Sequence, residues 1–325
     1  MKHLLTRLVL AVPVFAAPLA LAQTGPGMML VPWQHEGQLD LRVEGFFTPT
    51  EADVTGADVD LSILDAVGRV RLDPDSSYNP TIGFELIQYE LSSADAALPD
   101  DLTDVSIAFG GSFGDVDLGE TLGNWQMGFD IGLGYAGTTP FEEGEAYYLK
   151  ADLFAVQPID RDTRWLVGLN YDGNRVFLPD VPLPAVSYFA RYTDEITYAL
   201  GVPFSQVTWT PDDQWTIDIR SALFFSFNGR VTYQLSDSAQ LFGSYQIRQD
   251  AFYISNGPDH RRFLFSQQRA EAGVNYSLTE RLELVVAGGV ALDQEIDVGF
   301  DTRDPAGLRD LDDSGYIRVG VVIRY

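Results

Sequence analysis

The chain of 325 residues contains no cysteine and few histidines, and Lys and Arg are scarce, with 21 against 47 Asp and Glu. The missing cysteines exclude a disulfide scaffold, thiol catalysis and cysteine metal sites. A mean hydropathy of −0.03 is too polar for a helical membrane protein, which needs several apolar runs of about 20 residues. The formal net charge of −26 makes the chain a poor partner for nucleic acid, whose phosphates require Lys and Arg.

What is present begins with an export signal. Lys2 and Arg7 give a positive start, Leu8 to Leu21 is mostly apolar, and Ala20-Leu21-Ala22 fits a cleavage site before Gln23. A short membrane anchor is the alternative, but prolines interrupt the apolar run. We therefore predict a signal peptide over 1–22, a periplasmic segment over 23–37 and a single barrel domain over 38–325.

Period-two alternation dominates the rest of the chain. Trp125, Met127, Phe129, Ile131, Leu133 and Tyr135 share one face of a strand, whereas Gln126, Asp130 and three glycines share the other. Some of these strands are long, because Arg281 to Val298 alternates well past the five or six residues usual in soluble sheets. A strand that crosses a bilayer at a tilt needs about 9 to 11 residues. The pattern is therefore typical of a membrane barrel.

Short turns alternate with longer polar segments along the chain. The turns 209–215, 233–241 and 276–284 each combine an aromatic, a short polar reversal with Asp or Glu, and a new alternating run. Five longer polar segments lie between turns, at 92–103, 137–145, 172–184, 249–262 and 297–314. Short periplasmic turns and longer outer loops are the layout of an outer-membrane barrel.

The chain ends on GYIRVGVVIRY, Gly315 to Tyr325, a strand with an aromatic as its last residue. Because a barrel has no free edge, this strand should close onto the first one, near 39–47. Its apolar face resembles the signal read by the outer-membrane assembly machinery, and the residues of that face are Ile317, Val319, Val321, Ile323 and Tyr325. The alternative is an edge strand of a periplasmic sandwich.

We predict an all-β, antiparallel transmembrane barrel of about 14 strands, with 12 to 16 allowed. It lies in the outer membrane, in contact with its lipid and lipopolysaccharide. The stretch 194–211 predicts two strands that are short for a full crossing.

The same region carries a family resemblance. It contains Leu178-Pro179 with Leu183-Pro184, then Gly201-Val-Pro203-Phe-Ser205, then Trp209-Thr-Pro211-Asp-Asp-Gln-Trp215. These motifs resemble an uncharacterised family of bacterial outer-membrane barrels, domain of unknown function 6268. The resemblance extends over roughly the second half of the chain and implies location and fold, and it implies no catalytic residues.

Charged residues fall on the face of the strands that we assign to the lumen. They are tolerated there, whereas an Arg or Lys on the lipid face near the midplane costs about 2–4 kcal/mol. The candidate lumen residues are Arg42, Glu44, Asp130, Lys150, Asp152, Asp218, Arg220, Arg269, Glu271, Glu283, Asp293, Arg318 and Arg324. Their signs are mixed, so they could pack the barrel shut as an ion-pair network or set the selectivity of a pore.

Catalytic and metal-binding chemistry has weak support. Ser255, Asn256, Asp259 and His260 could belong to an outer-membrane hydrolase, but adjacency in sequence does not place a base within reach of a proton, and we predict no enzyme. No cofactor is expected, because a phosphate-binding loop ending in Lys-Ser/Thr is absent. Acidic residues gather in two loops and could bind Ca²⁺ or Mg²⁺ loosely, although a solvated acidic surface is the favoured interpretation. They are Asp95, Asp100, Asp101 and Asp104, then Asp301, Asp304, Asp310, Asp312 and Asp313.

Three functions follow as hypotheses. The first is a passive pore or binder for small solutes, with charges in the lumen and the Pro-rich loop at 172–184 as constriction elements. The second is a plugged structural or surface-interaction barrel. The third is an outer-membrane hydrolase that uses His260.

Overall fold

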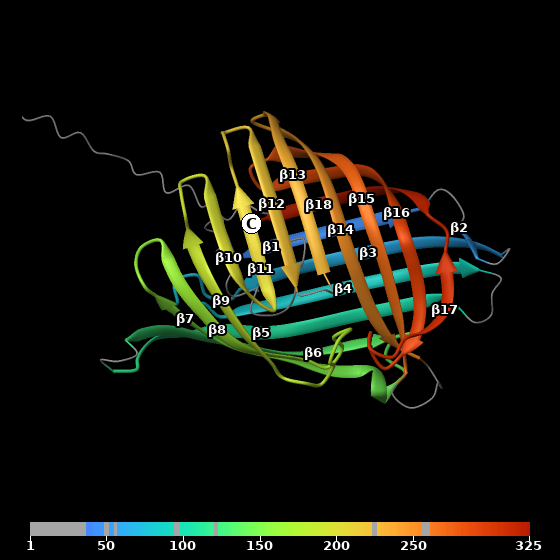
Figure 1. Ribbon diagram of the computed structural model, residues 1–325, viewed down its shortest axis with the longest axis horizontal. Helices are drawn as coiled ribbons and strands as arrows, with labels where there is room; N and C mark the ends of the chain where they lie inside the picture. The colour runs from blue at the N-terminus through green and yellow to red at the C-terminus, as the bar shows by residue number, and fades with distance from the viewer. Residues whose placement is uncertain are drawn as a thin grey trace, which may run out of the picture.

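The computed structural model describes residues 37–48, 52–54, 57–93, 98–119, 123–222, 226–254 and 261–325. They form one closed antiparallel sheet of 18 strands, of which the short β2 and β17 are additions to a barrel of 16 (Figure 1). The predicted outer-membrane-type barrel is therefore confirmed, at the upper limit of the predicted strand count. None of the described helices is long and apolar enough to cross a membrane.

The strands follow one another around the barrel in sequence order, each paired with the next by a hairpin. The first half consists of β1 (Leu39–Phe47), β3 (Ala57–Arg71), β4 (Thr81–Ser93), β5 (Asp101–Asp117), β6 (Asn124–Gly137), β7 (Tyr147–Pro158), β8 (Thr163–Asp172) and β9 (Leu183–Arg191). The second half consists of β10 (Ile196–Val202), β11 (Phe204–Trp209), β12 (Trp215–Ala222), β13 (Ser226–Ser236), β14 (Ala239–Tyr253), β15 (Arg262–Thr279), β16 (Leu282–Gly299) and β18 (Ser314–Arg324). β2 (Ala52–Val54), β17 (Ala306–Leu311) and the 3₁₀ turn η1 (Gly144–Ala146) lie in connections between them.

The last strand closes the barrel as its sequence predicts. β18 pairs with β1 from Asp40 opposite Arg324 to Phe47 opposite Ile317, so neither strand leaves a free edge. Ile317 and Val319 are exposed on the outer face, and Arg318 between them is buried inside. Tyr325 is exposed at the end of the strand.

The barrel has two unlike ends. The start of β1, the end of β18 and the predicted short turns 209–215, 233–241 and 276–284 lie at one end, which we call the turn end. The described parts of the five longer polar segments lie at the opposite end, the loop end, because strands alternate in direction. This arrangement is the one expected when short turns face the periplasm and longer loops face outward.

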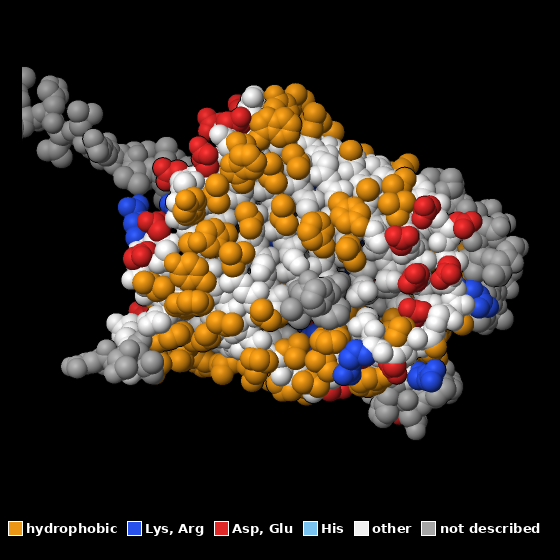
Figure 2. Space-filling view, in the orientation of Figure 1, with side chains coloured by type: hydrophobic (Ala, Val, Ile, Leu, Met, Phe, Trp, Pro, Cys, Tyr) orange, Lys and Arg blue, Asp and Glu red, His pale blue; other side chains and the backbone are white. Residues whose placement is uncertain are grey.

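Apolar side chains cover the outer face of the strands over much of their length (Figure 2). Outward residues such as Ile131, Leu149 and Leu200 are each more than half exposed, which would be costly in water and is favourable against lipid. Aromatic rings pack near the turn end, where Trp165 contacts Tyr188 and Trp215 contacts Tyr233. Amphipathic rings suit the interface between hydrocarbon and water.

The wall of the barrel is uneven in height. β14, β15 and β16 have 15, 18 and 18 residues, whereas β10, β11 and β12 have 7, 6 and 8. The short pair predicted within 194–211 is thus present as β10 and β11. In Figure 1 the strands of this low wall end partway across the face that β14 to β16 cross in full.

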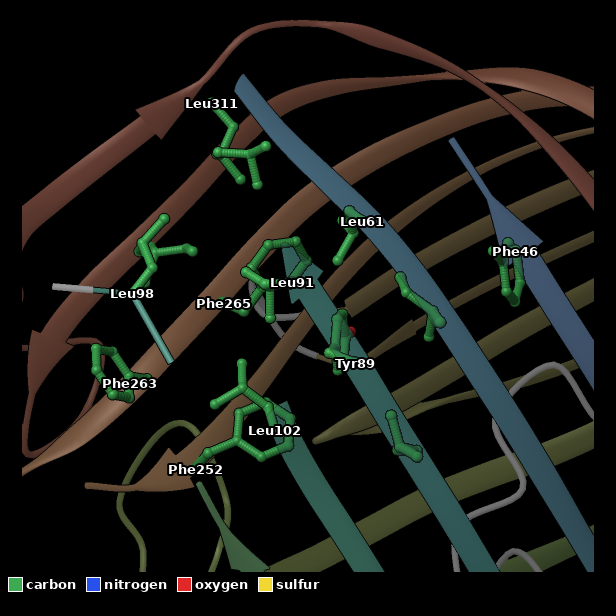
Figure 3. Close-up of a cluster of buried hydrophobic side chains, with 14 of the residues drawn as sticks. Phe46, Leu61, Tyr89, Leu91, Leu98, Leu102, Phe252, Phe263, Phe265 and Leu311 are labelled. Atoms are coloured by element: carbon green, nitrogen blue, oxygen red, sulfur yellow. The ribbon is translucent and has the colours of Figure 1, made fainter. Parts of the chain in front are cut away.

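The lumen at the loop end is filled by an apolar core (Figure 3). Tyr89 of β4 lies at its centre and packs on Phe252 and Phe265, with ring centroids 5.6 and 4.9 Å apart. The core joins opposite sides of the barrel, since β3, β4 and β5 contribute Leu61, Leu91 and Leu102, and β14 and β15 contribute the two phenylalanines. Tyr253 also pairs with Gly137 across this end. The described residues therefore constrict the lumen at the loop end.

Candidate functional site

A cavity of about 230 Å³ lies in the lumen beneath this core. Its lining combines inward side chains of β1, β3, β4, β5, β7, β8 and β14 with the β8–β9 loop, residues 173–182. It extends to Pro203 and Phe204 at the loop-end edge of the low wall. Alternation explains the polar lining, because every second side chain of a barrel strand faces inward.

Ion pairs line this cavity and join side chains of neighbouring and opposite strands. The Arg248 guanidinium lies 2.8 Å from Asp65 and 2.6 Å from Asp250, and Arg42 lies 3.8 Å from Asp65. On the opposite side the Lys150 ammonium lies 3.3 Å from Glu85. These groups are largely removed from solvent, so each charge requires its partner and the network resists rearrangement. The arrangement presents fixed charges of both signs to anything that enters the cavity.

The β8–β9 loop is fastened over the cavity by buried polar groups. The Asn174 amide donates to the carbonyl of Ala251 (2.9 Å) and to Asp104 (3.1 Å). Arg262, which is 1% exposed, donates to the carbonyls of Asn174, Arg175 and Phe300 at 3.2, 3.1 and 2.6 Å. Because buried acceptors are costly to leave unsatisfied, these bonds hold the loop against β14 and β15.

A second contact fixes the same loop to the loop between β16 and β17. The Leu178 amide donates to Asp301 (3.1 Å), and the Thr302 amide donates to the carbonyl of Val176 (3.0 Å). Burial alone would raise the pKa of Asp301, but hydrogen bonds from the Arg303 side chain and from the amides of Arg303 and Leu178 lower it below its ordinary value. The carboxylate therefore stays charged and keeps the two loops joined.

The structure places most of the predicted lumen residues on the inner face, and several of them form three ion-pair groups besides those around the cavity. Arg318 pairs with Glu44 at 2.6 Å and with Glu271, and Arg324 lies 3.4 Å from Glu283. Arg220 lies 2.6 Å from Asp218 on the low wall. Arg269 stacks on the Phe46 ring, with its guanidinium carbon 4.2 Å from the ring centroid.

Asp293 lies on the outer face instead. It has a positive φ of 44°, is exposed, and accepts a hydrogen bond from Gln268 of β15. The pairing of β15 with β16 shifts register at this point, between Ser266 and Gln268. A β-bulge inserts an extra residue and reverses the side to which the following residues point. Strict alternation along β16 therefore assigns the wrong face to this residue.

Several lining residues were missed by sequence reasoning, namely Asp65, Glu85, Asp104, Arg248 and Asp250. The reason is the apolar core at the loop end. In β3 the inward face carries Leu61 and Ile63 before Asp65, so both faces of the strand are partly apolar and the contrast that reveals the lumen face is lost. Pairing with Arg42 and Glu44 of β1 would have supplied the missing register, because β1 and β3 are neighbours.

Other predicted features lie outside the described residues: the signal peptide, the periplasmic segment up to residue 36, Asp95, Ser255, Asn256, Asp259 and His260. Of the acidic loop residues that are described, Asp104 lines the cavity and Asp301 pairs with Arg303 at 2.6 Å. Among the residues with described positions, no group of three or more His, Asp or Glu could hold a metal ion.

Among known proteins, similarity is found to solved structures. No family model matches the chain, so the resemblance noted above stays a prediction, and no curated protein matches. The solved structures that are similar include the toluene transporter TodX of Pseudomonas putida (8% identity, 93% of this chain and 92% of that one, TM-score 0.42). An outer-membrane channel from Pseudomonas putida F1 (13%, 90% and 96%, 0.37) and the NanC porin (9%, 88% and 100%, 0.32) are also similar. At these TM-scores the likenesses carry no argument about function.

Proposed function

We propose that the protein is a barrel of the Gram-negative outer membrane that takes a small, polar, charged solute into its lumen, as a gated pore or binder. The observation that carries the proposal is the charged cavity, which lies beneath a fastened loop and an apolar core. The C-terminal apolar face would serve the assembly machinery, and the outer surface would contact lipid and lipopolysaccharide.

The size and lining of the cavity limit the solute. A volume of about 230 Å³ corresponds to roughly eight water molecules at about 30 Å³ each. Both sides carry both signs of charge, with Lys150 beside Glu85, Asp104 and Asp172 on one side and with Asp65 and Asp250 beside Arg42 and Arg248 on the other. A solute that carries both signs of charge, or many hydrogen-bonding groups, would replace the lost hydration best. Passage through the loop end requires the β8–β9 loop or the core to move.

Single-channel conductance of the refolded mature protein in a planar bilayer tests the proposal. We expect brief, salt-dependent steps, and we expect Lys150→Met to shift the reversal potential towards cation selectivity because it removes a positive charge from the lining. Arg161→Met, in an exposed turn outside the lumen, is the matched control and should leave selectivity unchanged. Conductance steps with the same ion selectivity in Lys150→Met as in the wild type would contradict a path through this cavity.

The plugged barrel is the second candidate, and the apolar core at the loop end favours it. A correctly folded barrel that stays silent in the bilayer, with Tyr89→Ala silent as well, would support this structural role. Conductance that rises when Tyr89 is truncated would instead show that the core is the obstacle in a pore.

A further inference from the structure

Two carboxylates face each other on the inner wall, apart from the ion pairs described above. Asp130 of β6 and Asp152 of β7 are directly opposed across the strand pair. They are 2% and 4% exposed, and their carboxyl groups lie within hydrogen-bonding reach of each other. Like charges in direct opposition destabilise a sheet, and burial increases the cost. A fold with this pair therefore needs something between the two groups.

The hydrogen bonds around the pair leave most of its oxygens free. Both oxygens of Asp130 and the Oδ2 atom of Asp152 are buried without a hydrogen-bond partner among the described residues. The remaining oxygen, Oδ1 of Asp152, accepts from the Asn170 amide at 2.6 Å. Three unpartnered oxygens from two carboxylates are unusual in a folded interior, where polar atoms are almost always satisfied.

Nearby cations are committed elsewhere. Lys150 stands two residues before Asp152 on the same face, but its ammonium lies 3.3 Å from Glu85 and 3.4 Å from Ser106. Arg175 binds Asn170 and carbonyls of the β8–β9 loop. Asp172 adds a further negative charge that acts on Asp152, and Lys150 acts on Asp130 through its charge alone, without a hydrogen bond to it. The protein itself thus leaves the pair with an excess of negative charge.

The geometry resembles a prepared ligand set. Arg175 orients Asn170, and Asn170 orients Asp152, which is the supporting role that outer groups play around metal ligands. Gly110 is the residue across from Asp130 on β5, and Gly132 follows Asp130 on the same face, so neither position places a side chain over the carboxylate. Hydrated Mg²⁺ is commonly held by one or two carboxylates together with its own waters, and Ca²⁺ also prefers oxygen ligands.

We propose that Asp130 and Asp152 form a binding site for one divalent cation, Mg²⁺ or Ca²⁺, inside the barrel, with Asn170 as a positioning residue. Binding neutralises the opposed carboxylates and joins β6 to β7 on their inner face. The site does not depend on conductance through the lumen, because the cation can occupy it in a closed barrel as well as in an open one.

The test uses the full mature chain, refolded in detergent without lipopolysaccharide and freed of metals with a chelator. Isothermal titration with MgCl₂ and with CaCl₂ should reveal about one ion per chain for at least one of them, and that ion should raise Tm. Asp130→Asn should raise Tm in chelator, because the repulsion is gone, and should abolish the response to the ion. Asn170→Ala keeps both carboxylates and should weaken binding about 10- to 100-fold.

Asp218→Asn is the matched control. Asp218 is also a buried carboxylate of the inner wall, but it is bound by Thr208 at 2.8 Å and Arg220 at 2.6 Å, so its replacement should leave ion binding intact. A wild-type protein that binds neither ion, while Asp130→Asn still raises Tm, would overturn the proposal in favour of a proton shared by the pair. Binding that survives in Asp130→Asn, or that is lost equally in Asp218→Asn, would overturn the assignment to this pair.

Discussion

At the scale of single residues, Arg262 connects three parts of the chain that are far apart in sequence. Its guanidinium satisfies carbonyls of the β8–β9 loop and of Phe300, and only Arg can present several donors in one planar fork. We expect Arg262→Lys to lower the free energy of unfolding by about 2–4 kcal/mol, because buried acceptors lose charged donors. Equilibrium unfolding in urea, with the barrel refolded in detergent, measures this change.

Arg261→Lys is the control for that measurement, since Arg261 precedes Arg262 and is exposed. The expected difference for the control is below about 0.5 kcal/mol, as for most surface substitutions. If both variants unfold like the wild type, the fastening of the β8–β9 loop does not depend on Arg262. A loss in both would point to a property of the guanidinium groups that the two positions share, and not to the buried hydrogen bonds of Arg262.

At the scale of elements, the low wall depends on close contact between β9 and β10. A Cβ atom at Gly201 would lie 2.1 Å from the carbonyl oxygen of Val186, and backbone cannot yield as a flexible side chain can. We expect Gly201→Ala to destabilise the barrel by about 1–3 kcal/mol. Gly243→Ala is the control, because a Cβ there has nothing nearer than 3.9 Å. Thermal unfolding compares the two, and equal Tm values would show that the low wall adapts freely.

The sequence predicts those elements best in which one face is apolar and the other polar. β6 and β18 have this contrast, and their faces and the closure of β18 on β1 follow from it. The prediction fails where the interior itself is apolar, as in β3, or where a bulge interrupts the period, as at Asp293. The cavity could not be predicted from the sequence for a related reason. Asp65, Lys150 and Arg248 are brought together by the curvature of the barrel, and no regular spacing along the chain connects them.

At the scale of the whole molecule, the long strands carry the barrel surface from lipid into water. On β16 the outward Val290 belongs to the apolar surface, whereas Glu295, farther towards the loop end, is exposed and acidic. At the turn end Asp213 is exposed in the turn after β11. If the loop end faces the outside, these positions lie in lipid, outside the cell and in the periplasm, respectively.

Single cysteines can test this orientation, because the chain has none of its own. On intact cells a membrane-impermeant maleimide should label Glu295→Cys and leave Val290→Cys unlabelled, since thiols within hydrocarbon are out of its reach. Asp213→Cys should react only after the outer membrane is permeabilised, which also controls for expression of that variant. Labelling of Asp213→Cys but not Glu295→Cys on intact cells would reverse the barrel in the membrane. In that case the apolar core would close the periplasmic mouth, and a solute would reach the charged cavity from outside through the short turns.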